Sequence, residues 1–226
     1  FLETMNMPIY KIASFEINDI PLIRYVAKKH KPMIISTGVA DLDDIQLALD
    51  TCYKEGNYDI SLLKCTSEYP ATYEQANLLT IPDMIHRFGI PVGVSDHTMG
   101  SLVPVVAVSL GATIVEKHFI LSRTNGGPDS AFSMEPNEFR EMVDSIRNVE
   151  RTLGNVKYDI TDYQRGKRRS LYARTDIHCG DVFTDQNVGS YRPGVGLSPQ
   201  YWDQIMGKTC KREIVKGDVL RQEDLK

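Results

Sequence analysis

The stretch IPVGVSDHTMGSLVPVVAVSLGATIVEKHF, residues 90–119, decides the fold. It begins with a short apolar run at residues 90–95 and continues with a longer apolar stretch at 102–110. A second short run at residues 113–119, rich in β-branched side chains, ends it. This order predicts a buried strand, a helix and a second buried strand. Strands that are apolar throughout are typical of a parallel sheet with both faces covered.

The same alternation of strand and helix extends over the first 155 residues. Further strands are expected at residues 8–14, 32–37 and 60–66, and further helices at 21–29, 43–55, 73–88 and 136–153. Five strand–helix units in a row predict an α/β fold with a parallel sheet. No G-x-G-x-x-G or Walker loop is present, and polar residues end every strand, which favours a barrel over a doubly wound sheet. Because a closed barrel needs eight units, we expect a partial TIM (β/α)8 barrel, strands four to eight.

The alternation of strand and helix patterns ends after residue 155. Residues 155–169 are polar and basic, and two similar segments follow, DIHCGDVFTDQNV at 176–188 and EIVKGDVLRQEDL at 213–225. This internal repeat predicts a small β-rich domain with pseudo-symmetry, which we expect to pack on the barrel of another subunit. The expected division is therefore a barrel part at 1–155, a linker at 156–168 and the small domain at 169–226.

Composition excludes several classes of protein. The chain has 226 residues and a formal net charge of −4, so no basic excess is available for nucleic acid. No apolar run approaches the roughly 18–20 residues of a membrane helix, and the first residues do not resemble a signal peptide. The four cysteines lack disulfide-like or metal-like spacing. We therefore expect a cytoplasmic protein with reduced thiols and no membrane or nucleic-acid partner.

His97 and His118 are the sharpest candidates for chemistry, because each ends one of two consecutive predicted strands. Neighbouring strands lie about 4.8 Å apart, so two imidazoles at adjacent strand ends can share one ion. Two nitrogen ligands leave several positions open, which suits Mn²⁺ or Mg²⁺. The alternative is two separately hydrogen-bonded histidines. Asp96 and Glu116 could orient the two rings, or could instead form a salt bridge with Lys117 or Arg123.

A second group of polar residues lies at the ends of the earlier strands. Lys11 is unusual in an apolar strand, because an unpaired buried ammonium is costly. An anionic ligand would offset that cost, although strand parity leaves the direction of its side chain open, and it could instead reach solvent at an edge. The period of two places Ser14 and Glu16 on one face. The hydroxyls of the following strand ends favour a cradle for a carboxylate or phosphate over mere helix capping; they belong to Ser36, Ser67, Tyr69 and Ser95.

Two loop segments add candidates. The glycine-rich run at residues 126–133 could close over a ligand, with Asp129 accepting sugar hydroxyls, or could be a plain loop. In the tail, Arg192 stands before a Pro-Gly turn, where a guanidinium is exposed. Arginine suits recognition of planar anions and amides, whereas a surface arginine is the simpler interpretation.

These motifs resemble those of the nonulosonate (sialic-acid-type) synthase family. The matching pieces are YKIAS-E (10–16), IISTG (34–38), KCTSEYP (64–70), GVSDHT (93–98), LGATIVEKHF (110–119) and GPDSAFS (127–133). The tail resembles the antifreeze-like (SAF) domain that these enzymes carry. Within the family, EYPA, GGPDSAFS and KRRSLY are most similar to the members that make pseudaminic acid. The resemblance covers essentially the whole chain, except that the family's first three barrel units have no counterpart in it.

The resemblance implies a reaction in which phosphoenolpyruvate condenses with an N-acetylated amino sugar. Phosphate leaves by C–O cleavage and a nine-carbon α-keto acid forms; for pseudaminate the sugar is a 2,4-diacetamido-2,4,6-trideoxy-altrose. The resemblance also implies a transferase that works as a domain-swapped homodimer.

The resemblance assigns roles to the candidate residues. His97 and His118 would hold a divalent metal, Mn²⁺ or Mg²⁺, and Glu16 would transfer a proton and, with Asp129, bind sugar hydroxyls. Arg192 of a partner subunit would contact the N-acetyl group. Phosphoenolpyruvate would be bound by Lys11, Ser14, Ser36, Ser67, Tyr69 and Ser95. Sialic acid synthases have an asparagine where Ser67 stands. Alternatives are an N-acetylneuraminate or legionaminate synthase, or a non-catalytic fragment that binds carbohydrate or anions.

Overall fold

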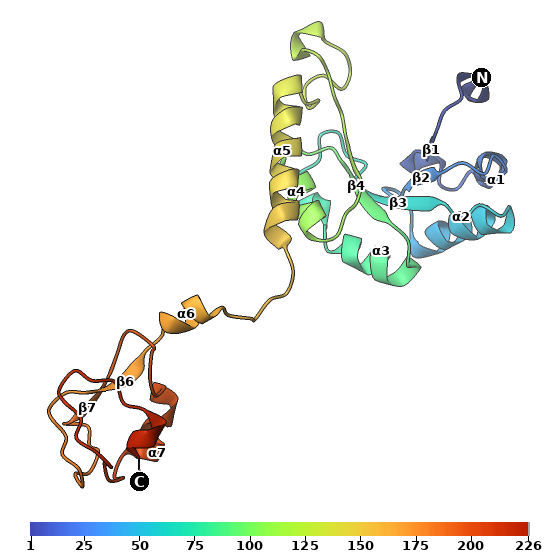
Figure 1. Cartoon of the computed structure of the whole chain (residues 1–226). Helices are drawn as coiled ribbons and strands as arrows, with labels where there is room; N and C mark the ends of the chain where they lie inside the picture. Colours follow the sequence, from blue (N-terminus) through green and yellow to red (C-terminus); the bar gives the residue numbers. More distant parts are fainter. Residues whose placement is uncertain (226) are drawn as a thin grey trace. The chain divides into compact units, whose positions relative to one another are not determined.

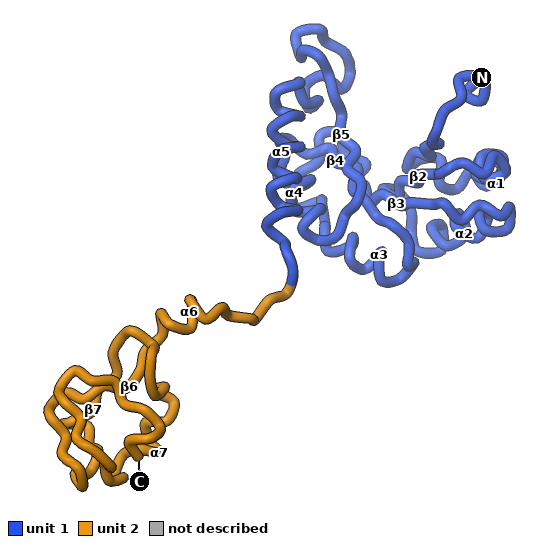
Figure 2. The backbone as a smooth tube through the Cα atoms, in the orientation of Figure 1, with its two compact units in different colours: residues 1–155 blue, residues 156–226 orange. Residues whose placement is uncertain are grey.

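The computed structural model describes residues 1–225 and divides the chain into two compact units, residues 1–155 and 156–226 (Figure 2). The first unit alternates strands and helices along the chain (Figure 1). Its strands are β1 (Tyr10–Ile12), β2 (Met33–Ser36), β3 (Ile60–Cys65), β4 (Val92–Asp96) and β5 (Val115–Lys117). Its α-helices are α1 (Ile20–Ala27), α2 (Leu42–Lys54), α3 (Thr80–Phe88), α4 (Leu102–Ser109) and α5 (Pro136–Leu153).

The five strands form one parallel sheet in the order β1-β2-β3-β4-β5. Because this order follows the sequence without a reversal, the sheet winds in one direction, as a barrel does and a doubly wound sheet does not. In a flat sheet, four strand spacings would hold β1 about 19 Å from β5. Yet Lys11 Nζ of β1 lies 3.7 Å from Glu116 Oε2 of β5, so the sheet is curved. The predicted fold class, a partial parallel barrel, is confirmed.

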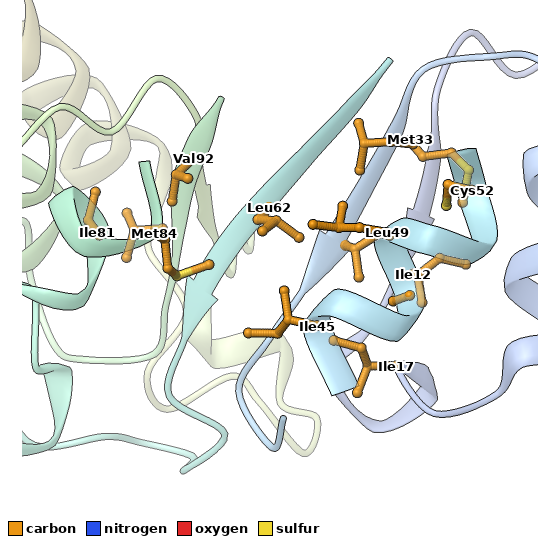
Figure 3. Close-up of a cluster of buried hydrophobic side chains, with 14 of the residues drawn as sticks. Ile12, Ile17, Met33, Ile45, Leu49, Cys52, Leu62, Ile81, Met84 and Val92 are labelled. Carbon is orange, nitrogen blue, oxygen red and sulfur yellow. The ribbon is translucent and has the colours of Figure 1, made fainter. Parts of the chain in front are cut away.

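The helix-facing side of the sheet is apolar. Ile12, Met33 and Leu62 are buried in one cluster with residues of α1, α2 and α3. Figure 3 shows Leu62 of β3 between the side chains of α2 and those of α3. Burial of a large aliphatic side chain contributes about 1.5–3 kcal/mol, so this layer of apolar contacts holds the strands in register.

Local sequence explains where the helices begin. Asp41 and Asp44 form a capping box at the start of α2, and Pro136 occupies the first turn of α5. The helix expected over residues 73–88 is wrong in its first part, because α3 starts only at Thr80. Asn77 has a left-handed φ of 42°, which separates the short 3₁₀ turn Glu74–Ala76 from α3. Within residues 1–225, none of the helices combines the length and the apolar character needed to cross a membrane.

The second unit contains the short helices α6 (Asp162–Gly166) and α7 (Trp202–Ile205) and the antiparallel pair β6 (Ser170–Ala173) and β7 (Val188–Tyr191). Small as it is, this unit buries an apolar cluster of its own around Leu171, Phe183 and Val188. The predicted small β-rich unit is confirmed. The 3₁₀ turns not yet mentioned are Leu2–Met5, Ser14–Glu16, Arg123–Asn125, Pro199–Tyr201 and Gln222–Asp224.

The two repeats of the second unit pair with each other. Ile177 and Ile214 form an antiparallel bridge in which each backbone N–H donates to the other residue's carbonyl at 2.9 Å. The carboxylate that opens each repeat accepts a backbone N–H from the turn of the other repeat. Asp176 accepts from Lys216, and Glu213 accepts from Cys179. The internal pseudo-symmetry predicted from the repeat is therefore present in the contacts.

Candidate active site

A chain of polar contacts crosses the concave face of the sheet. Lys11 Nζ donates to Ser36 Oγ at 2.7 Å and lies 3.7 Å from Glu116 Oε2. Ser95 Oγ donates to Glu116 Oε1 at 2.7 Å. Tyr10 and Ile12 are buried on the helix side, so the alternation of strand side chains directs Lys11 into the concave face. The open question about the direction of this lysine is thus settled toward the site.

Ser14 and Ser67 meet at Gly38, just beyond β2. Gly38 N donates to Ser14 Oγ at 3.1 Å. A Cβ atom at Gly38 would lie 2.2 Å from Ser67 Oγ and 2.9 Å from Ser14 Oγ, so a larger residue would push both hydroxyls out of these positions. The prediction that Ser14 and Glu16 share a face is wrong. The strand ends at Ile12 and the chain turns into a 3₁₀ helix, which buries Ser14 and leaves Glu16 exposed.

The two histidines lie side by side. His97 directly follows β4 and His118 directly follows β5, and their ring centroids are 5.2 Å apart. His97 Nδ1 lies 2.7 Å from the carbonyl oxygen of Thr66, which assigns the proton to Nδ1 and leaves Nε2 with a free lone pair. Burial lowers the pKa of His97 below its usual value, so the neutral ring is favoured. Asp129 Oδ2 lies 3.7 Å from His118 Nδ1.

Aromatic rings enclose the histidine pair. The ring of Tyr69 lies 4.1 Å from that of His97 and 6.0 Å from that of His118, measured between centroids. Phe132 lies 5.0 Å from His118. Burial raises the pKa of the Tyr69 hydroxyl, which keeps it protonated as a donor. Phe132 was not among the predicted residues, because one aromatic residue within a loop is an ordinary packing signal.

Asp96 does not orient His97. It forms an ion pair with Lys117, which was the alternative expected from the sequence. Asp96 Oδ2 lies 2.5 Å from Lys117 Nζ, on the side of the sheet opposite the histidines, and both side chains are almost completely buried. Glu116 does not bond to His118 either, since it is occupied by Ser95 and Lys11. The reason is parity: successive strand residues point to opposite faces, so Asp96 and His97 cannot meet across the strand.

A buried lysine was missed by the sequence reasoning. Lys64 of β3 is 8% exposed and donates to Thr66 Oγ1 at 2.7 Å. Burial lowers the pKa of its ammonium group. Its signal was available, because Lys64 stands in an apolar strand just as Lys11 does.

The remaining predicted residues are more exposed. Glu16 is exposed in the turn after β1, and Asp129 is exposed in the loop before α5. Arg192 follows β7 in the second unit and lines a hollow of about 380 Å³ there, together with Tyr172 and Tyr191. The first unit thus brings Lys11, Ser14, Ser36, Ser67, Tyr69, Ser95, His97, His118 and Asp129 to the carboxyl ends of its strands.

The side chains at the carboxyl ends of the strands include few possible metal ligands. Within residues 1–225, no group of three or more His, Cys, Asp and Glu side chains is arranged to hold an ion. His97 and His118 nevertheless present two neighbouring imidazoles, one of them with its free nitrogen defined by the bond to Thr66. Such a pair fits an ion that completes its coordination with water and substrate oxygens.

Two family models match the chain. The model of the NeuB family matches residues 1–158, and that of the SAF domain matches residues 168–226. Pseudaminic acid synthase from Campylobacter jejuni strain 81-176 is 42% identical over 100% of this chain and 67% of its own length. The N,N'-diacetyllegionaminic acid synthase of Campylobacter jejuni strain NCTC 11168 is 35% identical, over 98% of this chain and 68% of its own. The chain therefore spans about two thirds of these relatives.

A solved structure shows the same architecture. The spore coat polysaccharide biosynthesis protein SpsE from Bacillus subtilis superposes with a TM-score of 0.66 at 33% identity, over 100% of this chain and 69% of that one. The likeness thus extends over both units of the chain, from the curved parallel sheet to the small β-rich unit. With the two family matches, these findings show that the chain belongs to the NeuB family, the sialic acid synthase type, and carries a SAF domain.

Proposed function

We propose that the protein joins phosphoenolpyruvate to 2,4-diacetamido-2,4,6-trideoxy-altrose, forming the nine-carbon α-keto acid pseudaminate and phosphate. In this reaction C3 of phosphoenolpyruvate attacks the aldehyde carbon, water adds at C2, and phosphate leaves by C–O cleavage. The proposal is supported by the relative named pseudaminic acid synthase, which matches the whole chain at 42% identity. The single observation that carries it is that two groups of side chains lie at the same edge of the sheet. One is the cradle formed by Lys11 and the neighbouring serine and tyrosine hydroxyls, and the other is the pair of imidazoles of His97 and His118.

The cradle has the chemistry for an anion with a carboxylate and a phosphate. Lys11 already contacts a carboxylate, that of Glu116, at 3.7 Å. A substrate carboxylate or phosphate would offer this ammonium a shorter, charge-assisted hydrogen bond. The hydroxyls of Ser14, Ser36, Ser67, Tyr69 and Ser95 would donate further bonds to the oxygens of phosphoenolpyruvate.

His97 and His118 would hold a divalent cation, Mn²⁺ or Mg²⁺, whose Lewis acidity would polarise the aldehyde oxygen of the sugar. The lowered pKa of His97 supports this role, because a metal ligand must be the neutral imidazole. The rings of Tyr69 and Phe132 would exclude bulk water from the pair and restrict the rotation of its rings.

The sugar would be bound from the exposed side of the site. Asp129 and Glu16 would accept hydrogen bonds from its hydroxyls, and Glu16 is the candidate for proton transfer, since it is solvent-accessible. Arg192 would donate to the oxygen of an N-acetyl group.

We further propose that Arg192 is supplied by a second copy of the chain in a domain-swapped homodimer. Residues 1–155 contain 20 acidic and 13 basic residues, whereas residues 156–226 contain 10 acidic and 13 basic residues. Opposite net charges favour the approach of the SAF domain of one copy to the barrel part of another.

The test is a turnover assay with phosphoenolpyruvate and Mn²⁺. Three amino sugars are supplied separately: the altrose derivative, the precursor of legionaminate and the precursor of N-acetylneuraminate. Phosphate release and keto-acid formation with the altrose derivative support the proposal. Turnover with the legionaminate precursor alone would contradict the proposal and would indicate the activity named for the 35% identical relative, N,N'-diacetyllegionaminic acid synthase. Sugar binding without turnover, unaffected by Mn²⁺ and phosphoenolpyruvate in calorimetry, would indicate a non-catalytic binding module.

A further inference from the structure

We propose that the buried ion pair between Asp96 and Lys117 is a positioning device for the two histidines. It holds β4 and β5 at the register that brings the rings of His97 and His118 together. The inference rests on the proposed metal site, and it assigns a task to two side chains that touch neither substrate nor metal.

The geometry places the ion pair back to back with the histidine pair. Asp96 and Lys117 are direct partners across the β4–β5 ladder, and their Oδ2 and Nζ atoms are 2.5 Å apart. His97 and His118 are the residues that directly follow these two strands. Because successive side chains of a strand point to opposite faces, the same register that joins the charges on one face joins the imidazoles on the other.

The pair also fixes the backbone on both sides of His97. Asp96 Oδ1 accepts from Thr98 N at 2.9 Å, and its Oδ2 accepts from Thr98 Oγ1 at 3.1 Å. Lys117 Nζ donates to the carbonyl oxygen of Thr98. Residues 96–98 are therefore closed into a loop around the two charges, with His97 at its centre. The remaining freedom of the ring is removed by its bond to the Thr66 carbonyl.

Stability alone does not account for this arrangement. Side-chain exposures of 2% for Asp96 and 1% for Lys117 mean that both charges are desolvated. A desolvated ion pair is often no more stabilising than an apolar pair of the same volume. What it does provide is a unique register, since a slip by one residue would turn one of the two histidines to the helix-facing side and leave both charges unpaired.

The experiment separates positioning from stability. The double variant Asp96→Asn/Lys117→Met removes both charges of the pair, so neither is left buried without the other, and thermal unfolding is expected close to that of the wild type. Its Kd for Mn²⁺, measured by calorimetry, is expected to rise by about 10- to 100-fold, as when other groups that orient metal ligands are removed. The matched control is Arg212→Met/Asp224→Asn, which neutralises a buried carboxylate paired at 2.6 Å in the second unit and should leave the Kd unchanged.

A milder variant covers the case in which the double variant does not fold. Thr98→Val removes only the hydroxyl bond to Asp96 and should weaken Mn²⁺ binding less, in the same direction. A wild-type Kd in the folded double variant, or in Thr98→Val if only that variant folds, would overturn the inference. If wild-type protein binds no Mn²⁺ at all, the proposed metal site fails, and the positioning role fails with it.

Discussion

The two faces of the five-stranded sheet are built from alternating residues of the same strands, and they carry opposite chemistry. On the helix-facing side, Ile35, Leu62 and Val94 are buried in the apolar core. On the concave side, Ser36 and Ser95, each one residue further along, belong to the polar site. Stability and ligand binding should therefore be separable by substitutions one residue apart, with the buried charges of Lys64, Asp96 and Lys117 as exceptions within the apolar face.

The largest effect is expected on the concave face, at the proposed metal ligands His97 and His118. His118→Ala should weaken Mn²⁺ binding by about 100-fold or more, because half of the imidazole pair is lost. The unfolding temperature should change little, since the ring is partly exposed. Calorimetric titration with Mn²⁺ measures this, with His86→Ala on the exposed face of α3 as the control. Unchanged metal affinity in His118→Ala would remove this histidine from the site.

The next effect compares neighbours on β2. Ile35→Ala should lower the free energy of unfolding by about 2–5 kcal/mol, because it leaves a cavity in a fully buried cluster. Ser36→Ala should cost only about 1 kcal/mol of stability but weaken phosphoenolpyruvate binding, because Lys11 loses its hydroxyl partner. Urea unfolding and ligand titration of both variants decide the matter. Equal losses of stability would contradict the division between the two faces.

The next prediction concerns the apolar side of the sheet, where the stability of the protein should depend on pH through one buried thiol. Burial raises the pKa of Cys52 in α2 from 9.0 to about 11. The unfolded thiol ionises above about pH 8.5–9 while the folded thiol stays neutral, so the unfolded state holds fewer protons and stability falls as the pH rises from 9 to 11. The loss from this group is about 2–3 kcal/mol.

The measurement for Cys52 is urea unfolding at several pH values between 8 and 11. Cys52→Ala should show a shallower decline than the wild type, because the group that couples unfolding to thiolate formation is gone. Cys179→Ala, which removes an exposed thiol, is the matched control and should follow the wild type. Parallel curves for the wild type and Cys52→Ala would show that the buried thiol does not couple to unfolding.

The smallest effect is expected at Arg192, and it tests whether the SAF domain contributes a residue to the sugar site. Arg192→Ala should raise the KM for the sugar about tenfold, a loss of roughly 1.4 kcal/mol, and leave the KM for phosphoenolpyruvate unchanged. Steady-state kinetics with each substrate varied in turn measures this, beside Lys208→Ala, another exposed basic residue of the same unit. A larger change in the KM for phosphoenolpyruvate would place Arg192 outside the sugar site.

The SAF domain shows how far a sequence repeat predicts structure. The shared I-x-x-G-D-V pattern at residues 177–182 and 214–219 predicts two equivalent turns. The matching positive φ angles of Gly180 and Gly217, 97° and 92°, confirm it. The exchanged contacts of Asp176 and Glu213 with the opposite turns were not predictable. Equivalence in sequence does not say whether two copies pack on each other.

The sequence by itself determined the elements of this protein, the parallel sheet and the two histidines at adjacent strand ends. It could do so because apolar runs, helix caps and glycine turns are local signals that act over a few residues. Only the tertiary structure decided that Lys11 of β1 meets Glu116 of β5, that Ser14 and Ser67 converge on Gly38, and that Asp96 joins Lys117 rather than His97. These contacts depend on the curvature of the sheet and on which face each side chain takes, and residues far apart in the chain set both.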